Sequence, residues 1–551
     1  MKGFFKDWKF VFLLAILSLY ILFFSVLYQQ QVKTFVEGWS RELIITEIND
    51  QKASDLMNVK TTKVIPIPDE KLFLSIWYEH QTLHYSTIDT AGNILSTRKL
   101  DTTISGSNKL EALRDHDRID LYNLDAKQLS RYTFNWRTGE FIEQSLLSKG
   151  VHDVSAVADG AAYGSENNLE FITKGSVFPL GSDGSIISLD AFNDGIQSLY
   201  HLAYVEEKDG LRFLKYGTYD SSDNSFKSYT LDRLPSQSTI SISQIDIALY
   251  KDAVHIIVSS TNIKSAKAPV VNYYRFGLSQ PDKISVYPLS INSFAPNPKI
   301  INVEEKQLSF IASEDIMKGS NTEATNLVYY TVHNNEVLDK QLLTNTDDLS
   351  LNPEYFELDG HKYMYWTHVV GDSKNLLLAS DHPSIVNNAS KLKGDEWVKL
   401  FADTLIGLIP ITFISLIPFM YMFLPICLLL FFMSIFRLTW MENNTLKVLR
   451  IAIGLHVLIK IYYTLTNFSK NAPMYNSMPA FLQNPVSMFI IILALTLVAL
   501  YCTIEHMRKK GTSHFFMSYT FFAAIDVLLY SLLFLPYYYT NLILSYFTKV
   551  G

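Results

Sequence analysis

The chain has little cysteine, with two among 551 residues. Two cysteines cannot form the disulfide framework of a small secreted domain. Glycine and proline are also few, at 23 and 18 residues, and 48% of the chain is hydrophobic, which excludes collagen-like and disordered classes. Charged residues make up 18% of the chain, against about 25% in typical soluble proteins. Some part of the chain must therefore be nearly free of charge.

Charge is divided very unevenly along the chain. Residues 30–399 contain 35 basic and 49 acidic residues, which gives this part a net charge of −14. The flanking parts together contain 12 basic and 5 acidic residues, a net charge of +7. An acidic surface repels nucleic acid, so no nucleic-acid partner is expected. The pattern indicates a water-soluble acidic domain between two membrane-associated parts.

The N-terminal part, residues 1–29, has the pattern of a cytoplasmic tip and a transmembrane anchor. Residues 10–28 carry no charge, and at about 1.5 Å per residue they are long enough to cross a hydrocarbon core of about 30 Å. The run ends in polar residues, without the small-residue site at which signal peptides are cleaved. The positive-inside rule places the N-terminus in the cytoplasm, because three lysines precede the run, Lys2, Lys6 and Lys9.

Apolar runs return near position 400. Residues 404–436 carry no charge, and this run is too long for one straight span. We therefore predict an interfacial segment and one kinked or tilted span within 391–440. Three prolines offer positions for a bend, Pro410, Pro418 and Pro425. Three further spans are predicted within 441–551, at 449–468, 485–504 and 514–535. The sequence thus predicts a C-terminal bundle of four transmembrane helices.

The short basic loops predict the orientation of these spans. With five spans, all strongly basic short segments fall on the side of the N-terminus, so residues 30–399 are expected to be extracytoplasmic. Both cysteines, Cys427 and Cys502, lie within predicted spans. A domain without cysteine must be held by its own core, which suits an exported bacterial protein. We therefore expect a multi-pass protein of the bacterial plasma membrane.

The exterior part, residues 60–390, has the period-two hydrophobic pattern of an all-β domain. Runs such as 72–78 and 254–258 are rich in β-branched and aromatic residues and are bounded by turn signals such as Asp209-Gly210. The candidate strands group into seven units, near 61–98, 109–147, 150–180, 186–232, 238–290, 295–344 and 350–386. Four strands recurring every 40–50 residues or so are typical of β-propeller blades. We predict a seven-bladed β-propeller, with two stacked β-sandwiches as the alternative.

Residues 30–59 differ from the domain that follows. Scattered apolar residues among many polar ones favour a helical stalk that continues from the anchor, with an irregular linker as the alternative.

Most catalytic and metal-binding templates are absent from the sequence. There is no nucleophile elbow, no zinc-protease motif, no phosphate-binding glycine loop and no EF-hand loop. We predict no cofactor, no metal and no catalytic residue, and a non-catalytic role is favoured. One cluster, Asp115-His116-Asp117, is a candidate for cation binding or acid/base work, because carboxylates and an imidazole serve both. The competing interpretation is a solvated loop, where Asp is common.

The predicted membrane spans contain one unusual group of polar residues. Lys460 and Asp526 lie at similar depth in the third and fifth spans, and His456 is one helical turn before Lys460. Charges inside a membrane are costly and usually find a partner, so we predict a Lys460–Asp526 ion pair with His456 nearby. Such a cluster joins helices or forms part of a proton or ion route.

Three functions are compatible with this organisation. The first is an extracytoplasmic β-propeller that binds a ligand or a protein partner at the cell surface or in the membrane, as a sensor or scaffold. The second is a transporter, or a transport-accessory subunit, built around Lys460, Asp526 and His456. The third is an exterior hydrolase or lyase that uses carboxylates.

Overall fold

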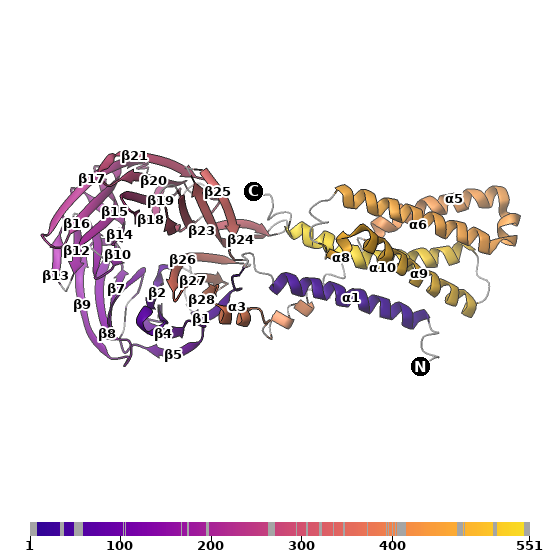
Figure 1. Ribbon diagram of the computed structural model, residues 1–551, viewed down its shortest axis with the longest axis horizontal. Coiled ribbons are helices and arrows are strands. Elements are labelled where there is room, and N and C mark those ends of the chain that lie inside the picture. Colours follow the sequence, from indigo (N-terminus) through magenta and orange to yellow (C-terminus); the bar gives the residue numbers. More distant parts are fainter. Residues whose placement is uncertain are drawn as a thin grey trace. The chain divides into compact units, whose positions relative to one another are not determined.

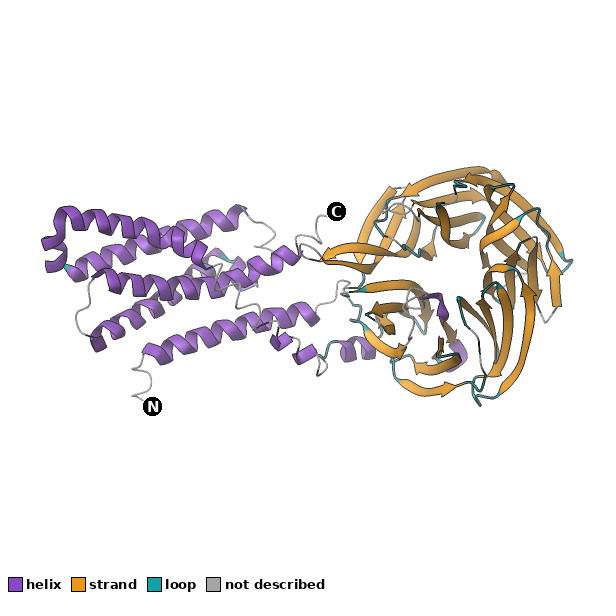
Figure 2. Ribbon diagram, turned by 180° about the vertical axis from the view of Figure 1, so that it is seen from behind, coloured by secondary structure: helices purple, strands orange, loops and turns teal. Residues whose placement is uncertain are grey.

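The computed structural model describes residues 8–544, apart from 33–37, 49–58, 103, 105, 167, 174–175, 194–197, 238, 263–269, 294, 305–306, 319–321, 334–335, 345, 347, 372, 393, 395, 399, 403, 405–414, 471–477, 479 and 511–514. The chain forms two compact units, one of residues 1–33 with 392–551 and one of residues 34–391. Helices make up the first unit and strands dominate the second (Figures 1 and 2).

The helical unit has the character of a membrane domain. Its helices are α1 (Trp8–Val32), α5 (Leu416–Asn443), α6 (Thr445–Lys470), α8 (Ala480–Gln483), α9 (Pro485–Lys510) and α10 (Phe515–Leu544). Five of the described helices, all except the short α8, are long and apolar enough to cross a membrane. The expectation of a membrane protein is therefore supported, with one such helix near the N-terminus and four after position 400.

Helix α5 is where the structure refines the prediction of a bent span. The helix runs through Pro425 without losing its helical assignment, and the residue with non-helical backbone angles is Arg437 (φ −144°, ψ 36°). Within the described part of this segment the non-helical residue is thus near the end of the helix and not at a proline, while Pro410 lies outside the described residues. The interfacial segment predicted before it lies partly outside the described residues, since 405–414 are not among them.

The membrane helices pack through one shared apolar core. Met422 and Ile426 of α5, Ala452 of α6, Ile492 of α9 and Phe522 of α10 are all buried in the same cluster. Other faces of these helices are apolar and exposed, as expected for surfaces that lipid covers.

The second unit contains five separate four-stranded antiparallel sheets, each formed by consecutive strands. Their strands are β2 (Thr62–Ile67), β3 (Leu72–Glu79), β4 (Thr82–Asp89), β5 (Ile94–Lys99); β6 (Lys109–Asp115), β7 (Arg118–Asp125), β8 (Gln128–Asn135), β9 (Phe141–Lys149); β10 (Val151–Val157), β11 (Gly160–Ser165), β12 (Leu169–Thr173), β13 (Ser176–Pro179); β14 (Ser185–Phe192), β15 (Leu199–Lys208), β16 (Leu211–Asp220), β17 (Ser225–Leu234); β18 (Ile240–Tyr250), β19 (Ala253–Asn262), β20 (Val270–Gly277) and β21 (Gln280–Leu289). Two short 3₁₀ helices, η2 (Val59–Thr61) and η3 (Pro68–Glu70), flank β2.

A sixth sheet of eight strands holds both the last and the first strands of the domain. Its members are β1 (Leu43–Ile48), β22 (Lys299–Val303), β23 (Gln307–Lys318), β24 (Thr322–His333), β25 (Glu336–Leu342), β26 (Leu349–Leu358), β27 (His361–Val370) and β28 (Ser373–Ser380). Strands β22–β25 form one antiparallel set, and β26–β28 with β1 form another. A single parallel pair, Thr325 with Leu349, joins the two sets. The short helix α3 (Pro383–Ala389) follows β28.

The first strand of each set lies at the centre of a ring of sheets. These inner strands contact one another in the order β2, β6, β10, β14, β18, β22, β26 and back to β2. Figures 1 and 2 show the sheets standing around a common centre. The domain is therefore β-propeller-like, and the two-sandwich alternative is not what the structure shows.

Burial within each sheet explains the sequence pattern. The second strand of a set, such as β3 or β15, is buried on both faces because neighbouring sheets cover it, and β3 is almost continuously apolar. The outermost strand, such as β5 or β9, is largely exposed and polar. The period-two hydrophobic pattern is therefore found mainly in strands of intermediate burial.

The helical stalk predicted for residues 30–59 is wrong at its centre. Residues 43–48 form strand β1, which pairs antiparallel with β28 through Leu43 and Leu378. The buried residues of β1, Ile45 and Ile48, are three apart, a spacing that fits a helix face as well as a bulged strand. Residues 33–37 and 49–58 of this segment lie outside the described part.

Candidate functional site

Three helices of the membrane unit bring together the polar residues singled out in the sequence. Lys460 of α6 donates to both carboxylate oxygens of Asp526 on α10, at 2.8 Å each, and to Thr496 Oγ1 of α9 at 2.7 Å. His456 Nε2 lies 3.1 Å from Asp526 Oδ2. The charged side chains have no solvent-exposed surface in the unit. All three residues predicted to form the cluster are therefore in contact, while their role stays a prediction.

The cluster extends by hydroxyl groups on the same helices. Tyr519 of α10 lies 3.2 Å from His456 Nδ1, and Tyr530 of α10 lies 3.0 Å from Thr464 of α6. The Lys460 ammonium also sits 5.7 Å from the centre of the Tyr530 ring. A buried ion pair with this many partners satisfies both of its charges, and removing either charge leaves the other uncompensated.

The structure places the Asp115-His116-Asp117 cluster at the turn between β6 and β7. His116 has a positive φ of 52° there, and its carbonyl accepts from Arg114 Nε at 2.9 Å. Asp117 accepts from Arg137 Nε at 2.7 Å. Asp115 and His116 are exposed, and no group of three metal-ligating side chains occurs in the described part of the chain. This geometry is that of a solvated hairpin turn.

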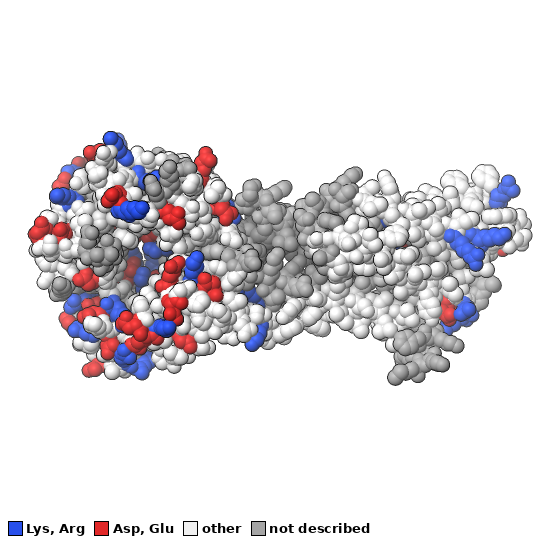
Figure 3. Space-filling view, in the orientation of Figure 1, with Lys and Arg blue, Asp and Glu red and all other residues white. Residues whose placement is uncertain are grey.

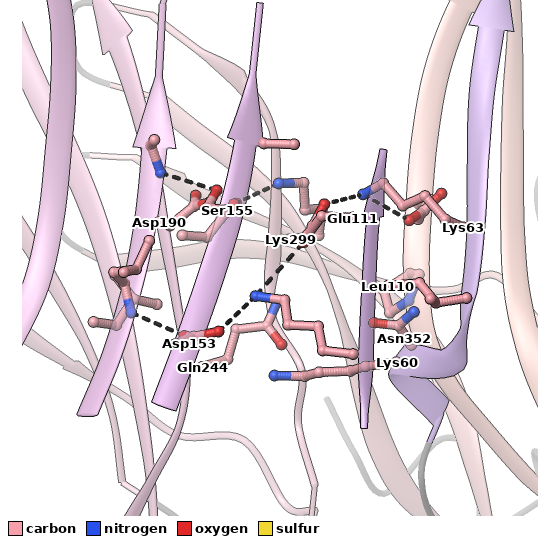
Figure 4. Close-up of a pocket in the computed structure, with 18 of the residues that line it drawn as sticks. Lys60, Lys63, Leu110, Glu111, Asp153, Ser155, Asp190, Gln244, Lys299 and Asn352 are labelled. Atoms are coloured by element: carbon pink, nitrogen blue, oxygen red, sulfur yellow. Dashed lines mark hydrogen bonds and ion pairs between the residues drawn. The ribbon is translucent and has the colours of Figure 1, made fainter. Parts of the chain in front are cut away.

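The centre of the β-propeller-like domain holds a polar pocket that the sequence did not indicate. It has a volume of about 190 Å³ and is lined from all seven inner strands. Nine of its lining side chains are charged, Lys60, Lys63, Lys109, Glu111, Asp153, Asp190, Asp246, Lys299 and Glu354. Figure 3 shows both acidic and basic side chains in the hollow of this domain, and Figure 4 shows several of them converging.

Four of the five carboxylates connect one inner strand to the next. In each case a carboxylate oxygen accepts the backbone N–H of a residue on the following inner strand. The contacts are Leu189 N to Asp153 at 2.9 Å, Ile247 N to Asp190 at 3.1 Å, Val64 N to Glu354 at 2.9 Å, and Ile300 N to Asp246. We call this arrangement the carboxylate ring. It satisfies backbone groups that neighbouring sheets would otherwise leave buried and unpaired.

Lysines neutralise most of the carboxylates. Lys63 lies 3.1 Å from both Glu111 and Glu354, and Lys109 lies 2.8 Å from Asp153. Lys299 lies 2.5 Å from Asp246. Ser155 and Ser188 donate to Asp190 and Asp153 at 2.7 and 3.2 Å (Figure 4). With the Lys109 ammonium 3.5 Å from the second oxygen of Glu111, each oxygen of the five carboxylates has at least one donor or ammonium group within 3.5 Å.

Burial and charge set the pKa values in the pocket. Burial would raise the pKa of Asp153, but the ammonium groups of Lys109 and Lys60 and the backbone contacts outweigh it, so that pKa is lowered. For Asp246, burial and the negative charge of Asp190 prevail over Lys299 and raise the pKa to about 7. Burial and then the positive charge of Lys109 lower the pKa of Lys60.

Lys60 is the exception among the four lysines. It extends from η2 into the pocket and donates to the carbonyl of Ser243 on β18 at 3.2 Å. No carboxylate oxygen of the described residues lies within ion-pair distance of it. Beside Ser243, the carbonyl oxygen of the Gln244 side chain is buried without a hydrogen-bond partner (Figure 4). One cation and one acceptor in the pocket therefore remain available.

Sequence reasoning missed this pocket because its charges are far apart along the chain. Each inner strand contributes only one or two of them, such as Asp153 in VHDVSAV and Asp246 in ISISQIDIALY. A charged residue recurring inside the first strand of successive units was the signal that could have revealed it.

Comparisons with known proteins assign no family. No family model and no curated protein matches the sequence. Among solved structures, the chain is similar to the Trypanosoma rangeli sialidase in complex with 2,3-difluorosialic acid, with a TM-score of 0.34 and 10% identity over 60% of each chain. The phage phi92 endosialidase gives 0.38 and 9% over 62% of this chain and 68% of that one. The polysaccharide lyase Uly1 gives 0.40 and 9% over 62% of this chain and 98% of that one. The chain thus spans about 60% of the length of the sialidase, and likenesses of this size assign no activity to it.

Proposed function

We propose that the protein is a multi-pass membrane protein whose β-propeller-like domain is an extracytoplasmic ligand- or protein-binding module, acting as a sensor or scaffold. The supporting observation is the polar pocket to which all seven inner strands contribute. Ligand sites are typically concave places where a few polar groups from several elements converge. The chain continues into membrane helices on both sides of the domain, which suits passage of a binding event to the membrane.

The domain has seven blades in this proposal. Five blades are separate sheets, and the eight-stranded sheet supplies the other two because only Thr325 and Leu349 pair between its halves. The last blade then takes its outermost strand, β1, from the N-terminal end of the domain.

Binding explains the pocket better than hydrolysis does. A carboxylate-dependent hydrolase needs one carboxyl group free to donate a proton and another free to act as base or nucleophile. Here every carboxylate oxygen of the pocket already accepts from a lysine, a serine or a backbone N–H. The carboxylates hold the domain together, which leaves the space between them for an occupant.

The test is whether blocking the pocket removes ligand-induced stabilisation. The full chain in detergent is mixed with a small-molecule extract of the cells that produce it, and its unfolding temperature is measured. A ligand at 100 times its Kd adds about 2.7 kcal/mol of stability. We expect the extract to raise the unfolding temperature of the wild type but not of Ala156→Trp, which adds a large side chain at a half-buried position of the pocket lining. Lys227→Trp, on the exposed outer strand β17, is the control and should respond like the wild type. A response of Ala156→Trp equal to that of the wild type would exclude the pocket as the binding place.

Transport is the second candidate, because the Lys460–Asp526–His456 cluster connects three helices inside the membrane unit. Structural joining of the helices is the competing role. Exchanging the charges, Lys460→Asp with Asp526→Lys, separates an ion pair from two independent charges. Each single change should lower the yield of folded protein, since breaking a buried pair costs about 3–5 kcal/mol, and the exchange should restore part of it.

The readout is the fraction of monodisperse protein after detergent extraction. Leu458→Ala, at an exposed position of α6, is the control and should keep the wild-type yield. If the exchanged protein folds no better than either single variant, the two residues do not act as a pair. A transport role further requires that Asp526→Asn abolish uptake of a proton or ion in vesicles while the protein stays folded.

A further inference from the structure

One of the four lysines of the central pocket has no carboxylate partner, and this indicates the charge of the molecule that the pocket binds. Lys63, Lys109 and Lys299 each contact a carboxylate at 3.1 Å or less, whereas Lys60 contacts only a backbone carbonyl. An ammonium group that is shielded from water is costly unless an anion or several acceptors accompany it. Lys60 is therefore the one lysine of the pocket that can accept an anionic partner without breaking an existing ion pair.

A cationic occupant is disfavoured by the same set of contacts. The pocket has five carboxylates against four ammonium groups, and this formal excess of negative charge would at first favour a cation. Yet both oxygens of every carboxylate already accept a hydrogen bond or an ion pair. A cation would have to share these oxygens with ammonium groups and N–H donors already in contact with them, and the positive charge of those groups opposes its binding.

Two further features limit which molecules can occupy the pocket. Gln244, next to Ser243 on β18, has a buried side-chain carbonyl without a partner, so the occupant should donate a hydrogen bond there. The volume of about 190 Å³ admits a small molecule but no folded segment or glycan chain. The formal excess of negative charge and the single free ammonium fit a monoanion better than a dianion.

We propose that the central pocket binds a small α-hydroxy acid, with its carboxylate on Lys60 Nζ and its hydroxyl donating to Gln244 Oε1. This inference rests on the proposed binding function and names the ligand class for the same pocket.

The test is a binding titration of the full chain in detergent with glycolate, acetate and inorganic sulfate. Glycolate should bind, acetate should bind about 2–10-fold more weakly because it lacks the donor, and sulfate, a dianion without a donor, should not compete. Lys60→Met should weaken binding at least tenfold and Lys60→Arg should keep most of it. Gln244→Met should remove the difference in affinity between glycolate and acetate. If Lys60→Met does not fold, this variant tests the proposal in its place.

Lys127→Met provides the matched control, because Lys127 is exposed and pairs with Glu166 away from the pocket. It should bind like the wild type. The inference is overturned if no carboxylate of the panel binds, or if Lys60→Met binds as tightly as the wild type. If the panel fails while the extract still stabilises the wild type but not Ala156→Trp, the binding function stands and only the ligand class is wrong. If neither the panel nor the extract has an effect, the binding function fails as well.

Discussion

At the scale of single residues, the carboxylates of the central ring have a structural use that is independent of any ligand. Asp153, Asp190 and Asp246 each accept an N–H from the next inner strand, so one side chain fixes the position of a neighbouring sheet. Their environments differ, because Asp153 lies close to two ammonium groups, those of Lys109 and Lys60, whereas Asp246 has Lys299 beside it but is almost fully buried and lies near the negative charge of Asp190.

The raised pKa of Asp246 predicts a pH effect on stability. Its pKa is about 7 in the folded protein, against an ordinary value of 3.8 for aspartate, so the folded protein holds the proton more tightly than the unfolded chain does. The corresponding stability is present below about pH 4 and is lost as the pH rises to 7. Asp246→Asn removes this titration, so the unfolding temperature of the variant minus that of the wild type should increase between about pH 4.5 and pH 7.5. A flat difference for Asp246→Asn would contradict the raised pKa of Asp246.

At the scale of elements, the sequence predicted the grouping of strands well because that grouping rests on local signals. The boundaries of the predicted units agree with β2–β5, β6–β9 and the later sets to within a few residues, apart from the end of the last unit, which is predicted at 386 where β28 ends at Ser380. Turn residues and apolar runs are visible without knowing what they contact. Strand β1 was missed because it is short and isolated, and only β28, far along the chain, makes it a strand.

The same contrast explains which site residues could be found. Lys460 and Asp526 are conspicuous because a charge within an apolar helix is rare. Lys60 and Asp246 lie among many charged residues of a soluble domain, and only the closed ring of inner strands brings them together.

The contribution of β1 to the domain can be measured with two adjacent isoleucines. Ile45 is 4% exposed and packs with Phe73 and Tyr365, whereas Ile44 is 44% exposed. Ile45→Ala should lower the free energy of unfolding by about 2–5 kcal/mol, the usual cost of such a buried truncation. Ile44→Ala should stay within about 0.5 kcal/mol of the wild type. Denaturant unfolding followed by near-ultraviolet circular dichroism gives both values, and equal effects would mean that β1 is not docked on β28.

At the scale of the whole molecule, the separation of charge has a physical consequence for topology. The acidic part, residues 30–399, contains the β domain, and the described basic residues of the flanks, apart from the buried Lys460, lie near the ends of apolar helices. Basic short loops stay in the cytoplasm, whereas long domains follow the orientation that such loops set.

The proposed orientation predicts opposite labelling of two engineered cysteines. In a background with Cys427→Ala and Cys502→Ala, Lys227→Cys lies on exposed β17 and Arg508→Cys lies at the end of α9. A membrane-impermeant maleimide should label the Lys227→Cys protein in intact cells. It should label the Arg508→Cys protein only after permeabilisation. The reverse pattern would place the β domain in the cytoplasm.

The pairing of β1 with β28 also has a consequence for folding during synthesis. Leu43 and its partner Leu378 are 335 residues apart, so β1 emerges long before the strand that it needs. At about 5–20 residues per second, the wait is about 17–67 s. During that time the hydrogen-bonding edge of β1 is open to wrong partners, such as the same segment of another copy. The sheet that contains β1 can form only after β28 has been synthesised. Assembly of this domain therefore depends on keeping β1 from pairing with a wrong strand before then.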